Sequence, residues 1–411
     1  MFLSALWLGL NFQSSAMLPI VVPAQLLLLI DAGSIGSERQ AVVLSLFSTA
    51  AALIAVAATP LAGFWSDELK RRSGTRRQLI TGGIAVAVAG QVGLALTTPL
   101  AVFLAGALLM LIGTNTATAA YQGLLPDLVR RSERGAASGW LGLMTLIGSV
   151  GSLAAAGVLL GGVSRGPRLE SEVRTGSAEF YAVAAMILVI CAATTVLGVR
   201  EKREPEATPA DGSRWTAALR HQPFRVVFAA RALVMIGLTL FLTYIEYYLA
   251  QTNGAVGFVG ATVVVALVAL VAALSSSLLF GVLSDRISRV SVVIAANVLM
   301  AAAALIFVVA PGGFPLAPLA VLFGLGYGAY LSVDWALAID SLPGAGSSAR
   351  DLGIFTVSIN LPTLIAPALG GLVILSAGAL GLSAIAYRLV FVLAAISLLL
   401  GIVVVRRVRF A

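Results

Sequence analysis

Twelve long apolar runs, separated by short polar segments, decide what this chain of 411 residues can fold into. A helix that crosses a membrane needs about 20 apolar residues. The runs reach that length, and they lack the strict alternation of β-barrel strands. The sequence therefore predicts an all-α membrane protein with twelve transmembrane helices, at 2–30, 40–64, 78–97, 99–125, 137–163, 179–199, 226–250, 255–283, 291–310, 316–340, 352–376 and 385–405.

Composition excludes several classes of protein. Only 11% of the residues are charged and 59% are hydrophobic, whereas soluble domains carry about 25% charged residues. Cys191 is the only cysteine and His221 the only histidine, so we expect neither a disulfide framework nor a His/Cys metal site. Phosphate-binding loops and nucleophile arrangements are also lacking in the sequence. We therefore expect no cofactor and no enzyme activity.

The basic residues predict the orientation of the chain. Of the 26 Lys and Arg residues, 20 fall on one predicted side of the membrane, five on the other, and Arg231 within a span. The positive-inside rule places the more basic side in the cytoplasm. We therefore expect a multi-pass protein of the cell (inner) membrane with both termini cytoplasmic. The same rule explains the net charge of +8, so we expect no nucleic-acid partner.

The longest polar stretch, Arg200 to Arg225, divides the spans six and six. Its Pro, Glu and Ala content is typical of a solvated linker. The sequence thus predicts an N-terminal six-helix bundle at 1–199, a cytoplasmic linker at 200–225 and a C-terminal six-helix bundle at 226–411. We expect the protein to be a monomer in the lipid bilayer.

One polar segment occurs twice in the chain. GFWSDELKRRSGTRR, from Gly63 to Arg77, follows the second span, and GVLSDRISR, from Gly281 to Arg289, follows the eighth. Both begin Gly-x-x-x-Asp, which puts Asp67 and Asp285 at equivalent places in the two halves. Glycine permits close helix contact, and a carboxylate there can meet a helix end or a basic residue. The alternative is that the arginines of these segments only fix the topology.

The two six-span halves, the linker and the repeated segment resemble the major facilitator superfamily. This resemblance implies two pseudo-symmetric six-helix bundles, and it implies that the repeated loops set the balance between inward- and outward-facing states. The spacing S-D-x-x-x-x-R-x-G-x-R-R looks like the glycoside–pentoside–hexuronide symporters and sucrose-transporter-like proteins, and the stretches Gly9 to Pro23 and Gly324 to Pro343 look similar to the latter group. The residues we expect to act in the switch are Gly63, Asp67, Arg72, Gly74, Arg76, Arg77, Gly281, Asp285, Arg286 and Arg289.

The resemblance also implies where a solute binds. In that superfamily the first, fourth, seventh and tenth helices line the central cavity. Amides and hydroxyls can pair with the hydroxyls of a sugar, and aromatic faces can stack on its ring. The same residues could instead bridge helices. The candidates for solute binding are Asn11, Gln13, Asn115, Tyr121, Gln122, Tyr244, Tyr327, Tyr330 and Trp335.

Charged residues inside the spans are costly in lipid and so point to function. Arg231 and Asp334 each lie near the inner end of their span, so we predict that they pair; a pair that serves only the structure is the alternative. Glu246, toward the outer end of the seventh span, is with Asp334 a candidate for proton coupling; a wet position at the interface is the alternative. We also expect Asp340 to meet a cytoplasmic arginine and Asp351 to cap the eleventh span.

The function that the sequence favours is secondary active transport by alternating access, with a sugar or related small polar solute moving together with a proton. Protons are favoured over sodium because the first six spans contain no central carboxylate. Efflux of drugs or amphiphilic, lipid-like compounds is the alternative. A receptor or scaffold that has kept the fold without transport is an alternative of another class.

Overall fold

The structure is a computed structural model that describes residues 2–22, 24–26, 37–96, 99–161, 170–199, 201, 217–284, 286–309, 316–344 and 348–408. For some residues within helices, chiefly 37–49 and 249–264, it describes the backbone alone. The described part of the chain is helical and contains no β-strand. The predicted all-α architecture is therefore confirmed.

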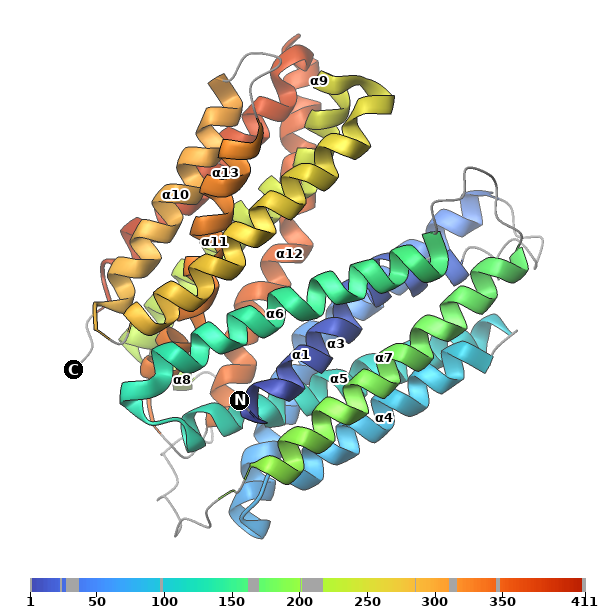
Figure 1. Cartoon of the computed structure of the whole chain (residues 1–411), viewed down its shortest axis with the longest axis vertical. Coiled ribbons are helices and arrows are strands. Elements are labelled where there is room, and N and C mark those ends of the chain that lie inside the picture. Colours follow the sequence, from blue (N-terminus) through green and yellow to red (C-terminus); the bar gives the residue numbers. More distant parts are fainter. Residues whose placement is uncertain are drawn as a thin grey trace. The chain divides into compact units, whose positions relative to one another are not determined.

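Figure 1 shows the described helices, coloured in the order in which they follow one another along the chain. Two of them, α1 and α6, end in π-helical turns, η1 and η3. The bounds of all the described helices are α1 Phe2–Ala16, η1 Met17–Val21, α3 Ser37–Ser73, α4 Arg77–Leu96, α5 Leu100–Leu128, η2 Arg131–Glu133, α6 Arg134–Ala156, η3 Gly157–Gly161, α7 Glu170–Gly198, α8 Ala217–Arg220, α9 Gln222–Leu283, α10 Arg289–Val309, α11 Leu316–Asp340, α12 Ser348–Ala379, η4 Ser383–Ile385 and α13 Ala386–Val405.

Ten segments of the described chain are long and apolar enough to cross a membrane, and they match the third to the twelfth predicted spans. The first two predicted spans, 2–30 and 40–64, fall partly on residues outside the described set. Helix α9 contains both the seventh and the eighth spans, Gln222–Ile245 and Val265–Leu283, without a recorded break. These two segments match the predicted spans at 226–250 and 255–283.

Contacts divide the chain into two compact units. Unit 1 comprises Met1–Leu128, Met144–Ala210 and Ala345–Ile354. Unit 2 comprises Val129–Leu143, Asp211–Gly344 and Phe355–Ala411. Helices α6 and α12 therefore each contribute residues to both units. The predicted domain boundaries at 199 and 226 stay a prediction.

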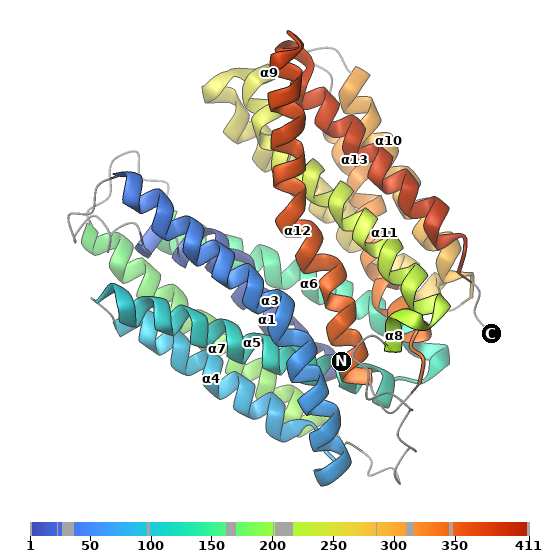
Figure 2. The same ribbon diagram turned by 180° about the vertical axis from the view of Figure 1, so that it is seen from behind.

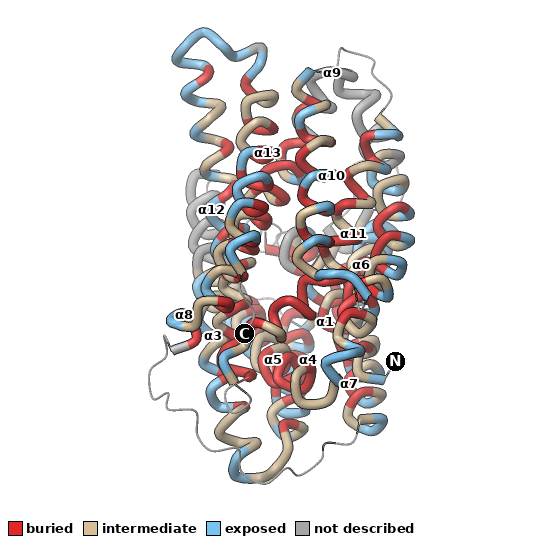
Figure 3. Tube along the Cα trace, turned by 90° about the vertical axis from the view of Figure 1, so that its left-hand side faces the viewer, coloured by how far each residue is buried: buried red, intermediate tan, exposed pale blue. Residues whose placement is uncertain are grey.

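Within each unit, neighbouring helices pack along their length. In unit 1, α4 lies between α5 and α7, while α1 packs on α7 and α3 on α5. In unit 2, α9 packs on α11 and α13, and α10 packs on the same two helices (Figures 1 and 2). Buried and exposed positions alternate along the helices (Figure 3).

Many exposed side chains are large and apolar, including Leu96, Val158, Leu197 and Leu375. In a membrane protein these side chains face lipid, so their exposure has no hydrophobic penalty. The buried core of unit 1 contains Phe12, Phe103, Phe180 and Tyr181. Unit 2 has a corresponding aromatic cluster, in which Phe241, Phe307, Phe323 and Phe391 contact one another.

Candidate functional site

The repeated segment of unit 1 is mostly helix rather than loop. Helix α3 continues to Ser73, so Asp67 and Arg72 lie on its last turns, and only 74–76 form a turn before α4. Gly74 ends the helix with a positive φ of 76°, and its N–H donates to the carbonyl of Lys70 at 2.7 Å. Glycine adopts this left-handed conformation without a steric penalty. The turn therefore brings the next residues back against α3.

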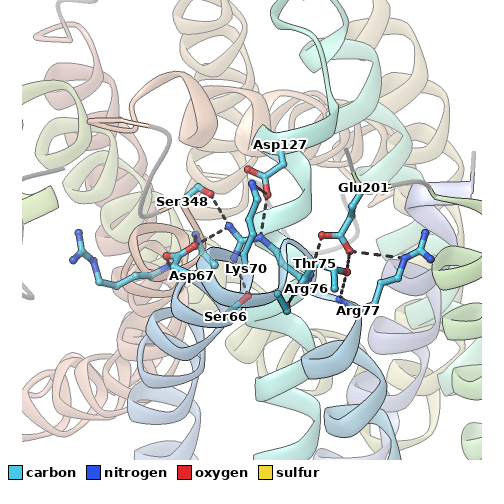
Figure 4. Close-up of polar contacts among 12 residues, drawn as sticks. Ser66, Asp67, Lys70, Thr75, Arg76, Arg77, Asp127, Glu201 and Ser348 are labelled. Atoms are coloured by element: carbon cyan, nitrogen blue, oxygen red, sulfur yellow. Dashed lines mark hydrogen bonds and ion pairs between the residues drawn. The ribbon is translucent and has the colours of Figure 1, made fainter. Parts of the chain in front are cut away.

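Arg76 is the centre of a buried polar network (Figure 4). Its side chain is only 1% exposed. One nitrogen donates to Asp67 at 2.8 Å and another to Asp127, at the end of α5, at 3.0 Å. The guanidinium also donates to the hydroxyls of Ser66 and Ser348. Burial alone would lower the pKa of Arg76, but the charges of Asp67 and Asp127 outweigh it and raise that pKa above its usual value, so the side chain stays charged.

Asp67 also caps the start of helix α12. Its two carboxylate oxygens accept the N–H groups of Ala349 and Arg350 at 3.1 and 2.8 Å. These are first-turn N–H groups, which lack partners within the helix and lie at its positive end. The cap predicted for Asp351 is therefore supplied at these positions by Asp67, and Asp351 accepts a hydrogen bond from Arg350 instead.

Gly63 permits the close approach that this cap requires. A Cβ atom at this position would lie 2.4 Å from the carbonyl oxygen of Ala349 and 2.8 Å from Cα of Arg350. Both contacts are with backbone, which cannot rotate away as a flexible side chain can. The position thus accepts only glycine if α3 and the start of α12 are to stay in contact.

We expect Gly63→Ala to lower the melting temperature of the purified protein. Overpacking of this kind costs about 1–3 kcal/mol, because the added methyl group must displace backbone at Ala349. The matched control is Gly82→Ala on α4, where an added Cβ would meet nothing within 4 Å. There alanine should be neutral or stabilise the helix by up to about 1 kcal/mol. Equal melting temperatures for the two variants would show that the contact at Gly63 does not matter.

Other basic residues of the segment have different surroundings. The side chain of Arg72 is 76% exposed and pairs with Glu68, four residues earlier, at 2.5 Å. Arg77 lies within 3.9 Å of Glu201, the second residue of the predicted linker. Glu201 also accepts hydrogen bonds from the hydroxyl of Thr75 and the N–H of Arg76 at 2.7 and 2.8 Å. The start of the linker is thereby attached to the turn between α3 and α4.

Unit 2 contains a related network at the start of α10. Asp340, at the end of α11, accepts hydrogen bonds from Arg289 and from Arg134, the latter at 2.7 Å. The predicted meeting of Asp340 with arginines is thus confirmed. Gly281 lies against Gly139, where a Cβ would be 2.8 Å from the facing Cα atom. Arg286 is exposed, and Asp285 lies outside the described residues.

The predicted pair of intramembrane charges is present in unit 2. Nη2 of Arg231, on α9, donates to Oδ2 of Asp334, on α11, at 2.5 Å, and both side chains are buried. The hydroxyl of Tyr330 donates to the other carboxylate oxygen at 3.0 Å. Trp335 and Phe355 place their rings against the guanidinium, with centroids 5.3 and 4.4 Å from Cζ. Two of the residues predicted to bind solute, Tyr330 and Trp335, thus surround this pair.

A group of neutral polar residues lies between α1, α5 and α6 in unit 1. Trp7 and Tyr121 stack with their ring centroids 5.7 Å apart. Nε2 of Gln13 donates to Thr114 at 2.7 Å, and Nε1 of Trp7 donates to Thr145 at 2.8 Å. Oε1 of Gln13 and the hydroxyl of Tyr121 are buried, and neither has a hydrogen-bond partner among the described residues.

The remaining solute-binding candidates occupy separate places. The amide of Asn11 donates to the Trp7 carbonyl, and that of Asn115 contacts Thr59 and the Leu111 carbonyl. The hydroxyl of Tyr244 donates to the carbonyl of Pro367 in α12 at 2.7 Å. The last sites to place are Gln122, which is buried in α5, Tyr327, which stacks on Phe323, and Glu246, whose side chain lies outside the described set.

Comparison with known protein families identifies the chain. The sequence profile of the Major Facilitator Superfamily matches residues 5–277 and again residues 227–411. The chain belongs to the Major Facilitator Superfamily. It is therefore a membrane transporter rather than an enzyme, as the sequence predicted. A search among curated proteins found no match.

Solved structures share the fold of this Major Facilitator Superfamily chain. The fucose:proton symporter FucP of E. coli is 14% identical, with a TM-score of 0.73 over 97% of each chain. A bacterial homologue of the iron transporter ferroportin is 17% identical, with a TM-score of 0.70 over 99% of each chain. The proton:xylose symporter XylE is 15% identical, with a TM-score of 0.68 over 96% of this chain and 94% of its own. At these identities the likeness shows the fold alone.

Sequence reasoning did not identify three residues that take part in the polar network of this Major Facilitator Superfamily chain. Asp127 and Asp67 both accept hydrogen bonds from Arg76. The hydroxyl of Ser348 accepts a hydrogen bond from the same guanidinium. Glu201, near the start of the linker, accepts a hydrogen bond from the N–H of Arg76. Asp127 follows Pro126 at the end of an apolar run, at the place that Asp340 takes in the second half. That repetition was the signal that could have found it.

Proposed function

We propose that the protein is a secondary active transporter that works by alternating access and moves a sugar or a related small polar solute together with a proton. The observation that carries this proposal is the pair of Arg231 and Asp334, buried on two membrane-spanning helices. Charges in such positions are costly and typically serve coupling or binding. Asp334 is the coupling carboxylate in this proposal, because its carboxylate can either pair with Arg231 or, when that pair opens, take up a proton. Glu246 is the second candidate for coupling.

Solute binding is proposed for the neutral polar group of unit 1 and for the aromatic residues around the pair in unit 2. The buried acceptor of Gln13 and the hydroxyl of Tyr121 can take hydrogen bonds from solute hydroxyls, and the ring of Trp7 offers a stacking face. FucP and XylE, which share the fold, are proton symporters of fucose and xylose. This likeness and the spacing from Asp67 to Gly74 support the sugar-symporter branch.

The networks at Arg76 and Arg289 are proposed to set the balance between inward- and outward-facing states. Asp67 can hold the first turn of α12 only while α3 lies against it, so the contact favours whichever state keeps the two helices together. Arg76 holds Asp67 in place for this cap. Arg72, which is exposed, has a smaller part in the proposal than its place in the sequence pattern indicates.

The proposed topology follows from the basic residues. Both termini and the linker at 200–225 lie in the cytoplasm, the two bundles at 1–199 and 226–411 form the moving halves, and the protein works as a monomer in the cell (inner) membrane. The ends of α3 and α5 and the starts of α4 and α12 then face the cytoplasm.

A transport measurement tests this proposal. We expect cells that express the protein to alkalinise a weakly buffered medium when a transported solute is added, because each solute carries a proton inward. Candidate solutes come from a thermal-shift screen of sugars and amphiphilic drugs. Resistance to hydrophobic toxicants without alkalinisation would instead show efflux. If cells show neither alkalinisation nor resistance, a receptor or scaffold is left as the function.

A further inference from the structure

The net charge of the chain resides almost entirely in unit 2. By sequence, unit 2 contains 13 basic and 6 acidic residues, whereas unit 1 contains 13 basic and 12 acidic residues. In unit 1, every basic residue of the segment from Gly63 to Arg77 lies beside a carboxylate. In unit 2, seven exposed arginines have no acidic partner among the described residues: Arg130, Arg131, Arg220, Arg225, Arg286, Arg406 and Arg407. Their charge is therefore available to an anion from outside the chain.

Three of these arginines lie at one end of unit 2, where α9 begins and α13 ends (Figure 1). Nε2 of Gln222, the first residue of α9, donates to the carbonyl of Arg407 at 2.7 Å, which holds the two helix ends together. Arg406 precedes Arg407 in the chain, and Arg220 lies two residues before Gln222. Like charges gathered at one end of a bundle repel one another, and an anion bound among them relieves that repulsion.

The end of α13 combines these cations with an apolar surface. Leu399, Leu400 and Val403 are exposed on the last two turns of the helix, where they face lipid. Helical hydrogen bonding continues beyond Val403 through Arg407. Residues three, four and seven positions apart lie on the same face of a helix, so Arg406 and Arg407 directly follow this apolar stripe. A stripe of this kind matches a molecule with an anionic head and apolar tails.

We propose that the start of α9 and the end of α13 form a binding site for an anionic phospholipid such as phosphatidylglycerol. Arginine can donate two parallel N–H bonds to the oxygens of a phosphate, and the acyl chains would lie along the apolar stripe of α13. The cytoplasmic leaflet, where the proposed topology puts this end of unit 2, is rich in anionic lipids. A free phosphate or a nucleic acid would use the arginines but not the stripe. The site is independent of the proposed transport function.

Native mass spectrometry of the purified full-length protein tests the proposal. Phosphatidylglycerol and phosphatidylcholine with the same acyl chains are offered at equal concentration, and the bound fraction of each is measured. We expect the protein to bind phosphatidylglycerol in preference to phosphatidylcholine. Glycerol 3-phosphate, which has a phosphate but no acyl chains, should not bind at the same concentration.

The double variant Arg406→Gln/Arg407→Gln assigns the preference to the end of α13. An arginine close to an anionic lipid surface contributes about a fivefold preference, so the double variant should lower the preference about 25-fold or abolish it. The matched control is Arg71→Gln/Arg72→Gln, which removes another adjacent pair of exposed arginines near a helix end. Both of these pair with Glu68, so the control should keep the wild-type preference. Unchanged melting temperatures in lipid-free detergent would show that both variants fold.

Four outcomes would overturn the inference. The first is a wild type without preference for phosphatidylglycerol, and the second is a preference that survives in Arg406→Gln/Arg407→Gln. The third is an equal loss in Arg71→Gln/Arg72→Gln, because net charge alone would then explain the attraction. The fourth is binding of glycerol 3-phosphate as tight as that of the lipid, because the arginines would then recognise a free phosphate.

Discussion

Replacing Arg76 with glutamine should lower the stability of the protein by about 3–5 kcal/mol, the usual cost of removing one partner from a buried ion pair. Asp67 and Asp127 both depend on this guanidinium and would be left facing each other without a cation between them, apart from the partly exposed Lys70 beside Asp127. The cap on α12 should weaken as well, because Arg76 positions the carboxylate that provides it. Thermal unfolding of the purified protein in detergent measures the effect.

Arg72→Gln is the control for this prediction. Arg72 belongs to the same segment and carries the same charge, but its side chain is 76% exposed and pairs only with Glu68 in the described structure. Surface substitutions of this kind usually change stability by less than about 0.5 kcal/mol. If Arg72→Gln proves as damaging as Arg76→Gln, net charge rather than the buried network explains the segment.

Arg231→Gln and Asp334→Asn should each destabilise the protein more than the double variant does. Each single change leaves an uncompensated charge in a membrane-spanning helix, which costs about 3–5 kcal/mol. The double variant removes both charges, leaving neutral amides that can bond to each other and to the hydroxyl of Tyr330. The measurement is a double-mutant cycle on the melting temperature, with transport assayed beside it.

The double-mutant cycle shows whether the two side chains stabilise each other, and the transport assay shows whether the pair also serves transport. A double variant that is no more stable than the weaker of the two singles would refute an energetic pairing of Arg231 with Asp334. A stable double variant that does not transport would place the pair in the transport mechanism rather than in the fold. The control is Arg225→Gln, which removes the positive charge of an exposed arginine elsewhere on α9.

The sequence was sufficient for the fold and for the intramembrane pair, because both depend on strong constraints. Apolar runs of about 20 residues have few alternatives to membrane helices, and two opposite charges at matching depths in neighbouring spans have few partners to choose from. Asp340 could be predicted for the same reason. These positions are fixed by the high cost of leaving a charge unpaired.

The details of the repeated segment could not be predicted, because they depend on where α3 ends. Sequence reasoning placed the helix end near residue 64 and so treated Arg72 and Arg76 alike. The helix continues to Ser73, which points Arg72 outward, and the left-handed turn at Gly74 then carries Arg76 back toward Asp67 and Asp127. Capping by Asp67 is a contact between residues more than 280 positions apart, and no local pattern reveals it.

Movement of protons with solute tests the account most directly. The wild-type protein and Asp334→Asn are reconstituted into vesicles that contain a pH-sensitive dye, and a solute identified by thermal shift is added outside. We predict that the solute drives protons into vesicles with the wild type and not into vesicles with Asp334→Asn. Solute entry without proton movement in the wild type, or equal proton movement in the variant, would contradict the account.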